Sequence, residues 1–200
     1  MAQKLSKRFG ARKVFSNIDF ELVTGESLAI TGHNGSGKST LMAVLLAMLR
    51  PTRGKVTFYE GEEVLSEDKI RASISLVAPY LNLYDQLSAE ENLKFFATVS
   101  GVHLTGKEIN DLLEQVGLKG RGHDLAGEYS SGMKQRLKYA VALLNEPAFL
   151  FLDEPTSNLD DAGKKIVVDL IEARRRDTVI LIATNEKEEY GLARQECRLV

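Results

Sequence analysis

The sequence has little of several features that mark specialised classes of protein. Its single cysteine, Cys197, cannot form an internal disulfide, which favours a reducing compartment. Its longest uninterrupted apolar run, Leu41–Leu49, is nine residues long, whereas a membrane-spanning helix needs about 20. The first residues lack the apolar stretch of a secretory signal peptide. We therefore expect a cytoplasmic chain that does not itself cross a membrane.

The chain also carries almost no net charge. Its 26 lysines and arginines against 28 aspartates and glutamates leave a formal charge of −2, so there is no general basic field for nucleic acid and no polybasic membrane anchor. We expect no nucleic-acid partner. What is present, 200 residues of which 44 % are hydrophobic and 27 % charged, is typical of one soluble globular domain.

Proline is scarce too, and each of the four prolines falls where the pattern ends an element. Alternating apolar and polar residues predict a strand over residues 14–22. Short apolar runs predict strands at residues 27–31, 56–59, 74–77, 149–152 and 179–183, the last two buried and parallel. Helical spacing predicts helices over residues 38–49, from residue 90, around residues 109–116 and over about residues 132–144. The helix-rich middle, about residues 80–146, therefore separates two strand-forming parts.

One motif stands out between a predicted strand and a predicted helix. Residues 32–39, Gly-His-Asn-Gly-Ser-Gly-Lys-Ser, match G-x-x-x-x-G-K-[ST] in full. Its glycines let the backbone curl so that successive N–H groups converge on phosphate oxygens. Lys38 can place a charge on the β- and γ-phosphates, and the Ser39 hydroxyl can ligate Mg²⁺. A chance glycine-rich turn would not have these flanking elements, so we predict a nucleoside triphosphate site. Its residues are Gly32, His33, Asn34, Gly35, Ser36, Gly37, Lys38, Ser39 and Thr40.

Two carboxylates end the predicted strand at residues 149–152. A buried strand that ends in Asp153 can place this carboxylate beside Mg²⁺, opposite Ser39. Glu154 is then positioned to orient or deprotonate an attacking water. Acids are common where a strand meets a loop, but the neighbouring phosphate loop favours the catalytic interpretation.

With Asp-Glu-Pro-Thr-Ser-Asn-Leu-Asp at residues 153–160, the chain resembles the ATP-binding cassette (ABC) ATPase domain over essentially its whole length. The resemblance implies a single domain over residues 1–200. Its α/β fold would be a P-loop NTPase core with a mixed, mainly parallel sheet flanked by helices. An antiparallel β subdomain and an α-helical subdomain inserted at about residues 80–146 would complete it. The implied cofactors are ATP and Mg²⁺, with the metal held by Ser39 and Asp153.

In that family two domains pack head to tail, and the signature of each closes on the ATP held by the P-loop of the other. The signature, usually Leu-Ser-Gly-Gly-Gln, corresponds here to Tyr-Ser-Ser-Gly-Met at residues 129–133. The resemblance thus implies that Ser130, Ser131 and Gly132 contact the nucleotide of a second copy. Ser130 and Gly132 also suit a helix N-terminus, where their role would be that of a cap.

Two further residues take their roles from the resemblance. Asp160 would lie in the loop that communicates across the dimer. Phe9 occupies the position of an aromatic side chain that stacks on adenine, although such a residue alone is more often part of a core.

Two departures from the family pattern bear on hydrolysis. After the strand at residues 74–77 the family usually has a glutamine that touches Mg²⁺ and the attacking water. Pro79 aligns there, and its side chain can do neither; Gln86 is expected to be a surface residue. After the strand at residues 179–183 the family has a histidine, whereas Asn185 can hydrogen-bond a γ-phosphate but cannot carry a charge. We therefore expect ATP binding to survive and hydrolysis by Glu154 with Asn185 to be slow.

The leading functional prediction is the nucleotide-binding subunit of an ABC transporter. It would pair with itself or a homologous subunit and drive a separate membrane-embedded permease from the cytoplasmic face. Candidate residues for the groove that receives the permease are Leu81, Leu83, Tyr84 and Leu87. The alternative is a soluble cassette ATPase that acts in assembly or regulation. A GTPase is more distant, because residues 185–188 resemble a guanine-reading motif only superficially and in the wrong order.

Overall fold

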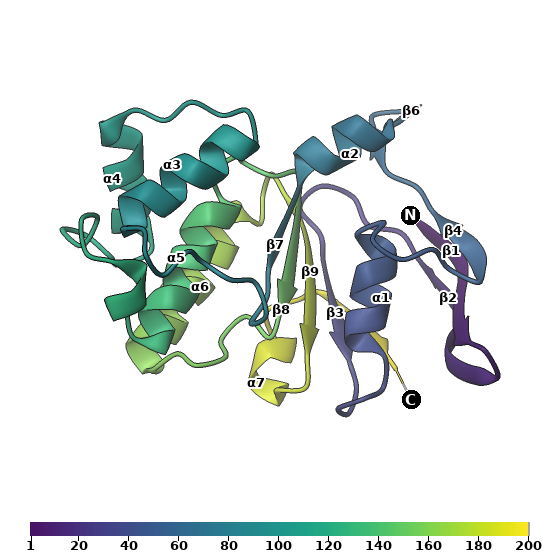
Figure 1. Ribbon diagram of the computed structural model, residues 1–200. Coiled ribbons are helices and arrows are strands. Elements are labelled where there is room, and N and C mark those ends of the chain that lie inside the picture. The colour runs from purple at the N-terminus through teal and green to yellow at the C-terminus, as the bar shows by residue number, and fades with distance from the viewer. Residues whose placement is uncertain (200) are drawn as a thin grey trace.

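The computed structural model describes residues 1–199, and a five-stranded parallel sheet forms its centre (Figure 1). The strand order is β10-β3-β9-β8-β7, with every neighbouring pair parallel. The strands are β3 (Ser27–Thr31), β7 (Ile74–Val77), β8 (Phe149–Asp153), β9 (Val179–Thr184) and β10 (Gln195–Arg198). Strands β3 and β9 are buried along their whole length, as parallel strands covered on both faces should be. The strands predicted at residues 27–31, 74–77, 149–152 and 179–183 are thereby confirmed.

A second sheet is antiparallel, in the order β2-β1-β4. Its strands are β1 (Ala2–Phe9), β2 (Arg12–Phe20) and β4 (Arg53–Val56), and a separate hairpin joins β5 (Tyr59–Glu60) to β6 (Glu63–Val64). The predicted strand at residues 56–59 is wrong. Val56 is the last residue paired with β1, and Phe58 then turns into the core, where its ring packs edge-on against Phe149 at 4.9 Å between centroids.

Helices cover both faces of the parallel sheet. They are α1 (Lys38–Leu45), α2 (Glu67–Ser73), α3 (Ala89–Val99), α4 (Gly106–Gln115), α5 (Ser131–Ala142), α6 (Asp161–Arg174) and α7 (Lys187–Tyr190), with a 3₁₀ turn η1 (Ala126–Glu128). Helices α3, α4, α5 and α6 lie on one side of the sheet, and α1 lies between that sheet and the antiparallel strands (Figure 1). The helices predicted in the middle of the chain are present, while the domain and subdomain boundaries stay predictions. No helix within residues 1–199 is both long and apolar enough to span a bilayer.

Alternate residues of the central strands belong to two different hydrophobic clusters. Leu150 and Leu152 pack among α3 to α6, whereas Phe151, between them on β8, packs with α1 and the antiparallel sheet. A one-residue slip of β8 would move each of these side chains from the cluster it fits to the cluster on the other face, so the packing fixes the register. The position of Asp153 at its end is set by this packing.

Helix α1 is shorter than predicted and ends at Leu45 instead of Leu49. The chain turns at Ala47, whose φ of +56° lies in the left-handed region, and the Leu49 N–H donates to Ala43 O at 3.0 Å. Met48 is left 71 % exposed by this turn. The apolar run continues past the helix, so apolar content alone could not reveal where the helix stops.

Candidate functional site

The loop between β3 and α1 has the backbone conformation that its glycines permit. Gly32, Gly35 and Gly37 adopt φ values of +146°, +83° and +104°, all in the region that favours glycine. A Cβ atom on Gly32 would meet Ser36 Oγ at 2.6 Å, and one on Gly37 would meet Val14 Cγ1 at 2.5 Å. Side chains at these two positions would therefore force the loop open as well as strain it.

The same loop presents positive charge and free donors. Lys38 is only 7 % exposed, and its Nζ donates to Gly32 O at 2.9 Å and to His33 O at 3.3 Å. No side chain within residues 1–199 caps α1, so its first N–H groups and its dipole point at the loop. Ser36 Oγ is buried and has no hydrogen-bond partner in the described chain. Together these groups fit a bound phosphate.

Two oxygen ligands suited to Mg²⁺ meet across the sheet edge. Ser39 Oγ donates to Asp153 Oδ2 at 3.3 Å, and Asp153 is 5 % exposed at the end of β8. Burial raises the pKa of the Asp153 carboxyl, and the hydrogen bond from Ser39 partly opposes that rise. The described residues hold no cluster of three or more metal ligands. Mg²⁺ needs only one or two protein oxygens when water and phosphate supply the others, so the pair fits it.

Glu154 follows in a strained conformation. Its φ is +49°, which costs a non-glycine residue about 1–3 kcal/mol unless its surroundings impose it. The Glu154 N–H donates to Ala183 O on β9 at 2.8 Å, which holds the residue against the neighbouring strand. Strain of this kind gathers at functional sites, and it accords with the role predicted for Glu154.

These groups line one cleft of about 720 Å³. Phe9 lines it and is 53 % exposed, which argues against a core role. The Lys7 Nζ lies over its ring, 4.9 Å from the centroid, so a stacked base would have to use the other face or displace Lys7. Arg12 and Val14 line the cleft as well, and neither was predicted from the sequence as a site residue. Arg12 pairs with Phe9 across the β1–β2 hairpin. The strand predicted from residue 14 would have had to begin at residue 12 to indicate that Arg12 lies beside Phe9.

The signature residues lie outside this cleft. Ser130 is the N-cap of α5, and its hydroxyl accepts from the Met133 N–H at 3.2 Å, so the capping role is present. Ser131 is exposed on the first turn. A Cβ on Gly132 would lie 3.2 Å from Asn158 O, so glycine lets α5 approach the segment after Glu154 closely. The nucleotide roles of Ser130, Ser131 and Gly132 stay predictions that require a second chain.

Asp160 is likewise outside the cleft and caps a helix. Its Oδ1 accepts from the Gly163 N–H at 2.8 Å at the start of α6. Its predicted part in communication between two chains is not tested by this contact.

The residue in the histidine position reaches the phosphate loop. Asn185 Nδ2 donates to Asn34 Oδ1 at 3.1 Å, so the end of β9 is joined to the loop. His33 is exposed, as expected of a solvated position, and Thr40 lines the cleft.

At the glutamine position the backbone is anchored from another helix. Lys138 Nζ, on α5, donates to Ala78 O at 3.3 Å and to Pro79 O at 2.8 Å. Gln86 is exposed and does not line the cleft. Among the described residues no glutamine lines the cleft, and the side-chain amide that does, that of Asn34, belongs to the phosphate loop and accepts from Asn185. Slow hydrolysis stays the expectation.

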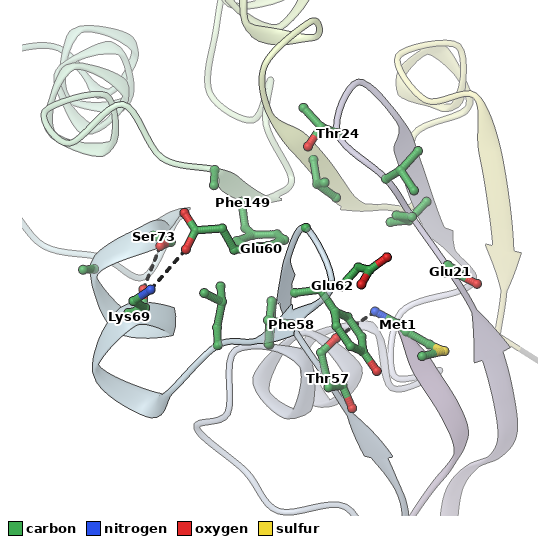
Figure 2. Close-up of a pocket in the computed structure, with 18 residues that line it drawn as sticks. Met1, Glu21, Thr24, Thr57, Phe58, Glu60, Glu62, Lys69, Ser73 and Phe149 are labelled. Carbon is green, nitrogen blue, oxygen red and sulfur yellow. Dashed lines mark hydrogen bonds and ion pairs between the residues drawn. The ribbon is translucent and has the colours of Figure 1, made fainter.

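A second cleft, of about 840 Å³, lies near the opposite ends of the strands (Figure 2). Phe149 and Val179, the first residues of β8 and β9, line it, together with the carboxylates of Glu21, Glu60 and Glu62. Ligands of open α/β sheets bind at the carboxyl ends of the strands, and three carboxylates disfavour phosphate. Lys69 and the Met1 ammonium line this second cleft as well, but it lies at the wrong ends of the strands, so the smaller of the two clefts stays the predicted nucleotide site.

A phosphate loop after β3, an acidic end of β8 and a parallel sheet between helices define a P-loop NTPase. The family model described as "ABC transporter" matches residues 15–157. The chain belongs to the ABC transporter family.

Relatives with known names span most of this chain. It is 34 % identical to the ABC transporter ATP-binding protein YdbJ of Bacillus subtilis, over 90 % of this chain and 59 % of YdbJ. It is also 34 % identical to the lantibiotic transport ATP-binding protein SrtF of Streptococcus pyogenes, over 92 % of this chain and 78 % of SrtF. The solved ATP-binding subunit of an ABC transporter superposes with a TM-score of 0.85 at 25 % identity, covering 99 % of this chain and 84 % of that one. The chain thus spans about 60 % of YdbJ and of several other bacterial relatives.

Exchange of Ser130 for aspartate separates the capping role from the nucleotide role. Aspartate caps a helix as well as serine does, but its charge would repel a γ-phosphate. We expect Ser130→Asp to leave Tm nearly unchanged and to lower ATP turnover by about tenfold or more. The measurements are thermal unfolding and phosphate release, with Ser66→Asp, at the exposed cap of α2, as the control. Wild-type turnover in Ser130→Asp would mean that Ser130 is a cap only.

Proposed function

We propose that this chain is the ATP-binding and ATP-hydrolysing subunit of an ABC transporter. The observation that carries the proposal is the single cleft in which Lys38, the Ser39–Asp153 pair and Glu154 meet. The substrate would be ATP with Mg²⁺, which neutralises charge on the phosphates when bound.

The polar residues in and beside the cleft have separate parts in this proposal. Lys38 and the loop N–H groups bind the β- and γ-phosphates, and Ser39 and Asp153 hold the metal. Glu154 orients water for in-line attack on the γ-phosphorus and takes its proton as the bond to the β–γ bridging oxygen breaks. Asn185, which lies outside the cleft lining and donates to Asn34 Oδ1, would turn its amide to donate a hydrogen bond to the γ-phosphate.

The active form would be a head-to-tail dimer with itself or a homologous subunit. Ser130, Ser131, Gly132 and Asp160 do not line the cleft of their own chain. Ser130 and Ser131 lie at the N-terminus of α5, a helix of 12 residues, where N–H groups and the dipole suit an anion. A second copy would bring this end onto the bound ATP and complete the site.

A separate permease would receive the energy at the cytoplasmic face of a membrane. Exposed aromatic side chains lie between β7 and the end of α3. Tyr84 and Phe95 are 46 % and 40 % exposed and their ring centroids are 4.7 Å apart, and Tyr80, 58 % exposed, precedes them in the chain. Such a patch suits a docking partner. Of the groove residues predicted, Tyr84 fits best, because Leu83 packs against the core. The names of SrtF and of the bacitracin transport protein BcrA support transport over the assembly alternative.

Asn185→His should increase turnover if the missing histidine limits the rate. A charged hydrogen bond to the γ-phosphate in the transition state is worth about 1.5–3 kcal/mol, which corresponds to about a tenfold gain or more. Phosphate release at saturating Mg-ATP measures it, and Asn185→Ala should lie below wild type. Equal rates for the wild-type and Asn185→His chains would show that another step limits turnover.

The proposal as a whole is tested by Mg-ATP hydrolysis of the purified chain. Phosphate release that requires Mg²⁺, is removed by EDTA and follows ATP binding supports it. A chain that binds neither ATP nor ADP, or one that binds ATP without hydrolysing it, would overturn it.

A further inference from the structure

A buried carboxylate lies just beyond the nucleotide cleft and does not line it. Glu189, on α7, is 3 % exposed. Its Oε1 accepts hydrogen bonds from the Thr156 N–H at 2.9 Å and from Thr156 Oγ1, while Oε2 is buried without a partner in the described chain. A buried carboxylate with one unpaired oxygen is costly. A residue kept there at such a cost needs an explanation.

Thr156 belongs to the turn that directly follows Glu154. The Ser157 N–H closes that turn by donating to Glu154 O at 3.1 Å. From another helix, the hydroxyl of the buried Tyr139, on α5, donates to Pro155 O at 2.9 Å. The turn is thus held from α7 and from α5, and Glu154 is held in its left-handed conformation at the start of it.

The segment that carries Glu189 also touches the phosphate loop. Asn185, four residues earlier, donates to Asn34 Oδ1, and the Glu186 N–H donates to Thr184 Oγ1 at 2.9 Å, which stiffens the turn between β9 and α7. One short segment therefore contacts the phosphate loop at one end and the turn after Glu154 at the other. It ties together the group that would bind the γ-phosphate and the group that would prepare the water.

We propose that Glu189 is a positioning residue for hydrolysis. It fixes the turn after Glu154 relative to the phosphate loop through its two bonds to Thr156, and so aims the Glu154 carboxylate at the attacking water. It does not touch the nucleotide. This inference rests on the proposed function, because it concerns the same cleft.

The test is the separate effect on kcat and KM in Glu189 variants. Glu189→Ala removes both bonds to Thr156, and displacement of Glu154 should lower kcat by about 10- to 100-fold. KM and Kd for ATP should stay within roughly twofold of wild type, because the phosphate contacts remain. Glu189→Gln keeps an oxygen that accepts both bonds, so it should restore most of the turnover. Glu188→Ala, whose carboxylate on the same helix is 88 % exposed, is the matched control.

Thr156→Val supplies an independent variant if Glu189→Ala does not fold. It keeps the backbone bond and the shape of the side chain while it removes the Oγ1 donor, and it should lower kcat less than Glu189→Ala does. Combined with Glu189→Gln, it should have a non-additive effect, because both act on one contact.

Different experimental outcomes would overturn the positioning role of Glu189 and the proposed function. Unchanged kcat in Glu189→Ala, or a Glu189→Gln chain as slow as Glu189→Ala, would overturn the positioning role while an active wild type keeps the proposed function. A loss of turnover that follows only a loss of ATP affinity would also overturn it. A wild-type chain without turnover would overturn the proposed function itself.

Discussion

Replacement of Glu154 by glutamine is expected to lower ATP turnover by about 10²- to 10⁴-fold, the usual contribution of a general base. Glutamine has nearly the same shape and still hydrogen-bonds water, but it cannot take the proton that the attacking water loses. ATP binding should persist, because the contacts from Lys38 and the loop are untouched. The measurements are phosphate release in steady state and ATP binding by calorimetry, since the chain has no tryptophan for intrinsic fluorescence.

Glu146→Gln is the matched control for this variant. Glu146 is an exposed glutamate with a φ of +44°, close to the +49° of Glu154. The same exchange there tests whether glutamine in a left-handed conformation harms the chain in general. Turnover in Glu154→Gln within a few-fold of wild type would remove Glu154 from the catalytic role.

Replacement of Lys38 by alanine is expected to weaken ATP binding about 10- to 100-fold, since a hydrogen bond from a charged group is worth about 1.5–3 kcal/mol. The ammonium is nearly buried beside two loop carbonyls, and ATP would exchange these acceptors for phosphate oxygens. Turnover should fall below detection at ordinary ATP concentrations. Titration of each variant with Mg-ATP by calorimetry measures the change in Kd.

Two controls accompany the Lys38 variant. Lys13→Ala removes an exposed lysine of β2 that does not line the cleft, and it should bind ATP as wild type does. Thermal unfolding without nucleotide checks whether Lys38→Ala has disturbed the loop, whose carbonyls of Gly32 and His33 lose their donor. A Kd equal to that of wild type in a folded Lys38→Ala chain would place the phosphates elsewhere.

The central strands could be predicted from the sequence because burial leaves a local mark. Each of β3, β8 and β9 contains a short, mainly apolar run of strand length. Apolar content gave wrong boundaries where the apolar residues continue past the end of a helix or strand. Leu46 and Leu49 lie beyond α1 but still pack against the hydrophobic cluster that contains Phe151. Phe58 lies outside any strand and packs against Phe149.

The same distinction applies to the candidate site. Lys38, Ser39, Asp153 and Glu154 were predictable because the chemistry of phosphate and metal needs them at fixed spacing in contiguous motifs. Arg12 reaches the cleft only after a hairpin has folded back onto Phe9.

Glu189 is the clearest case of a residue whose proposed role could not be predicted from the sequence. In the sequence it follows the polar residues 186–188 and gives no sign of burial. Its partner Thr156 is 33 positions away in the chain, so only the packing of α7 beside the turn after Glu154 reveals the contact.

Mixing two impaired variants tests whether each ATP site is completed by a second chain. Lys38→Ala retains the signature and Ser130→Asp retains the P-loop, so a mixed head-to-tail dimer contains one intact composite site. Equal amounts should recover up to about a quarter of wild-type turnover, since half the dimers are mixed and each has one of two sites intact. Turnover of the mixture no higher than the mean of its two components, at concentrations where the wild-type chain turns over, would contradict completion of the site by a second chain.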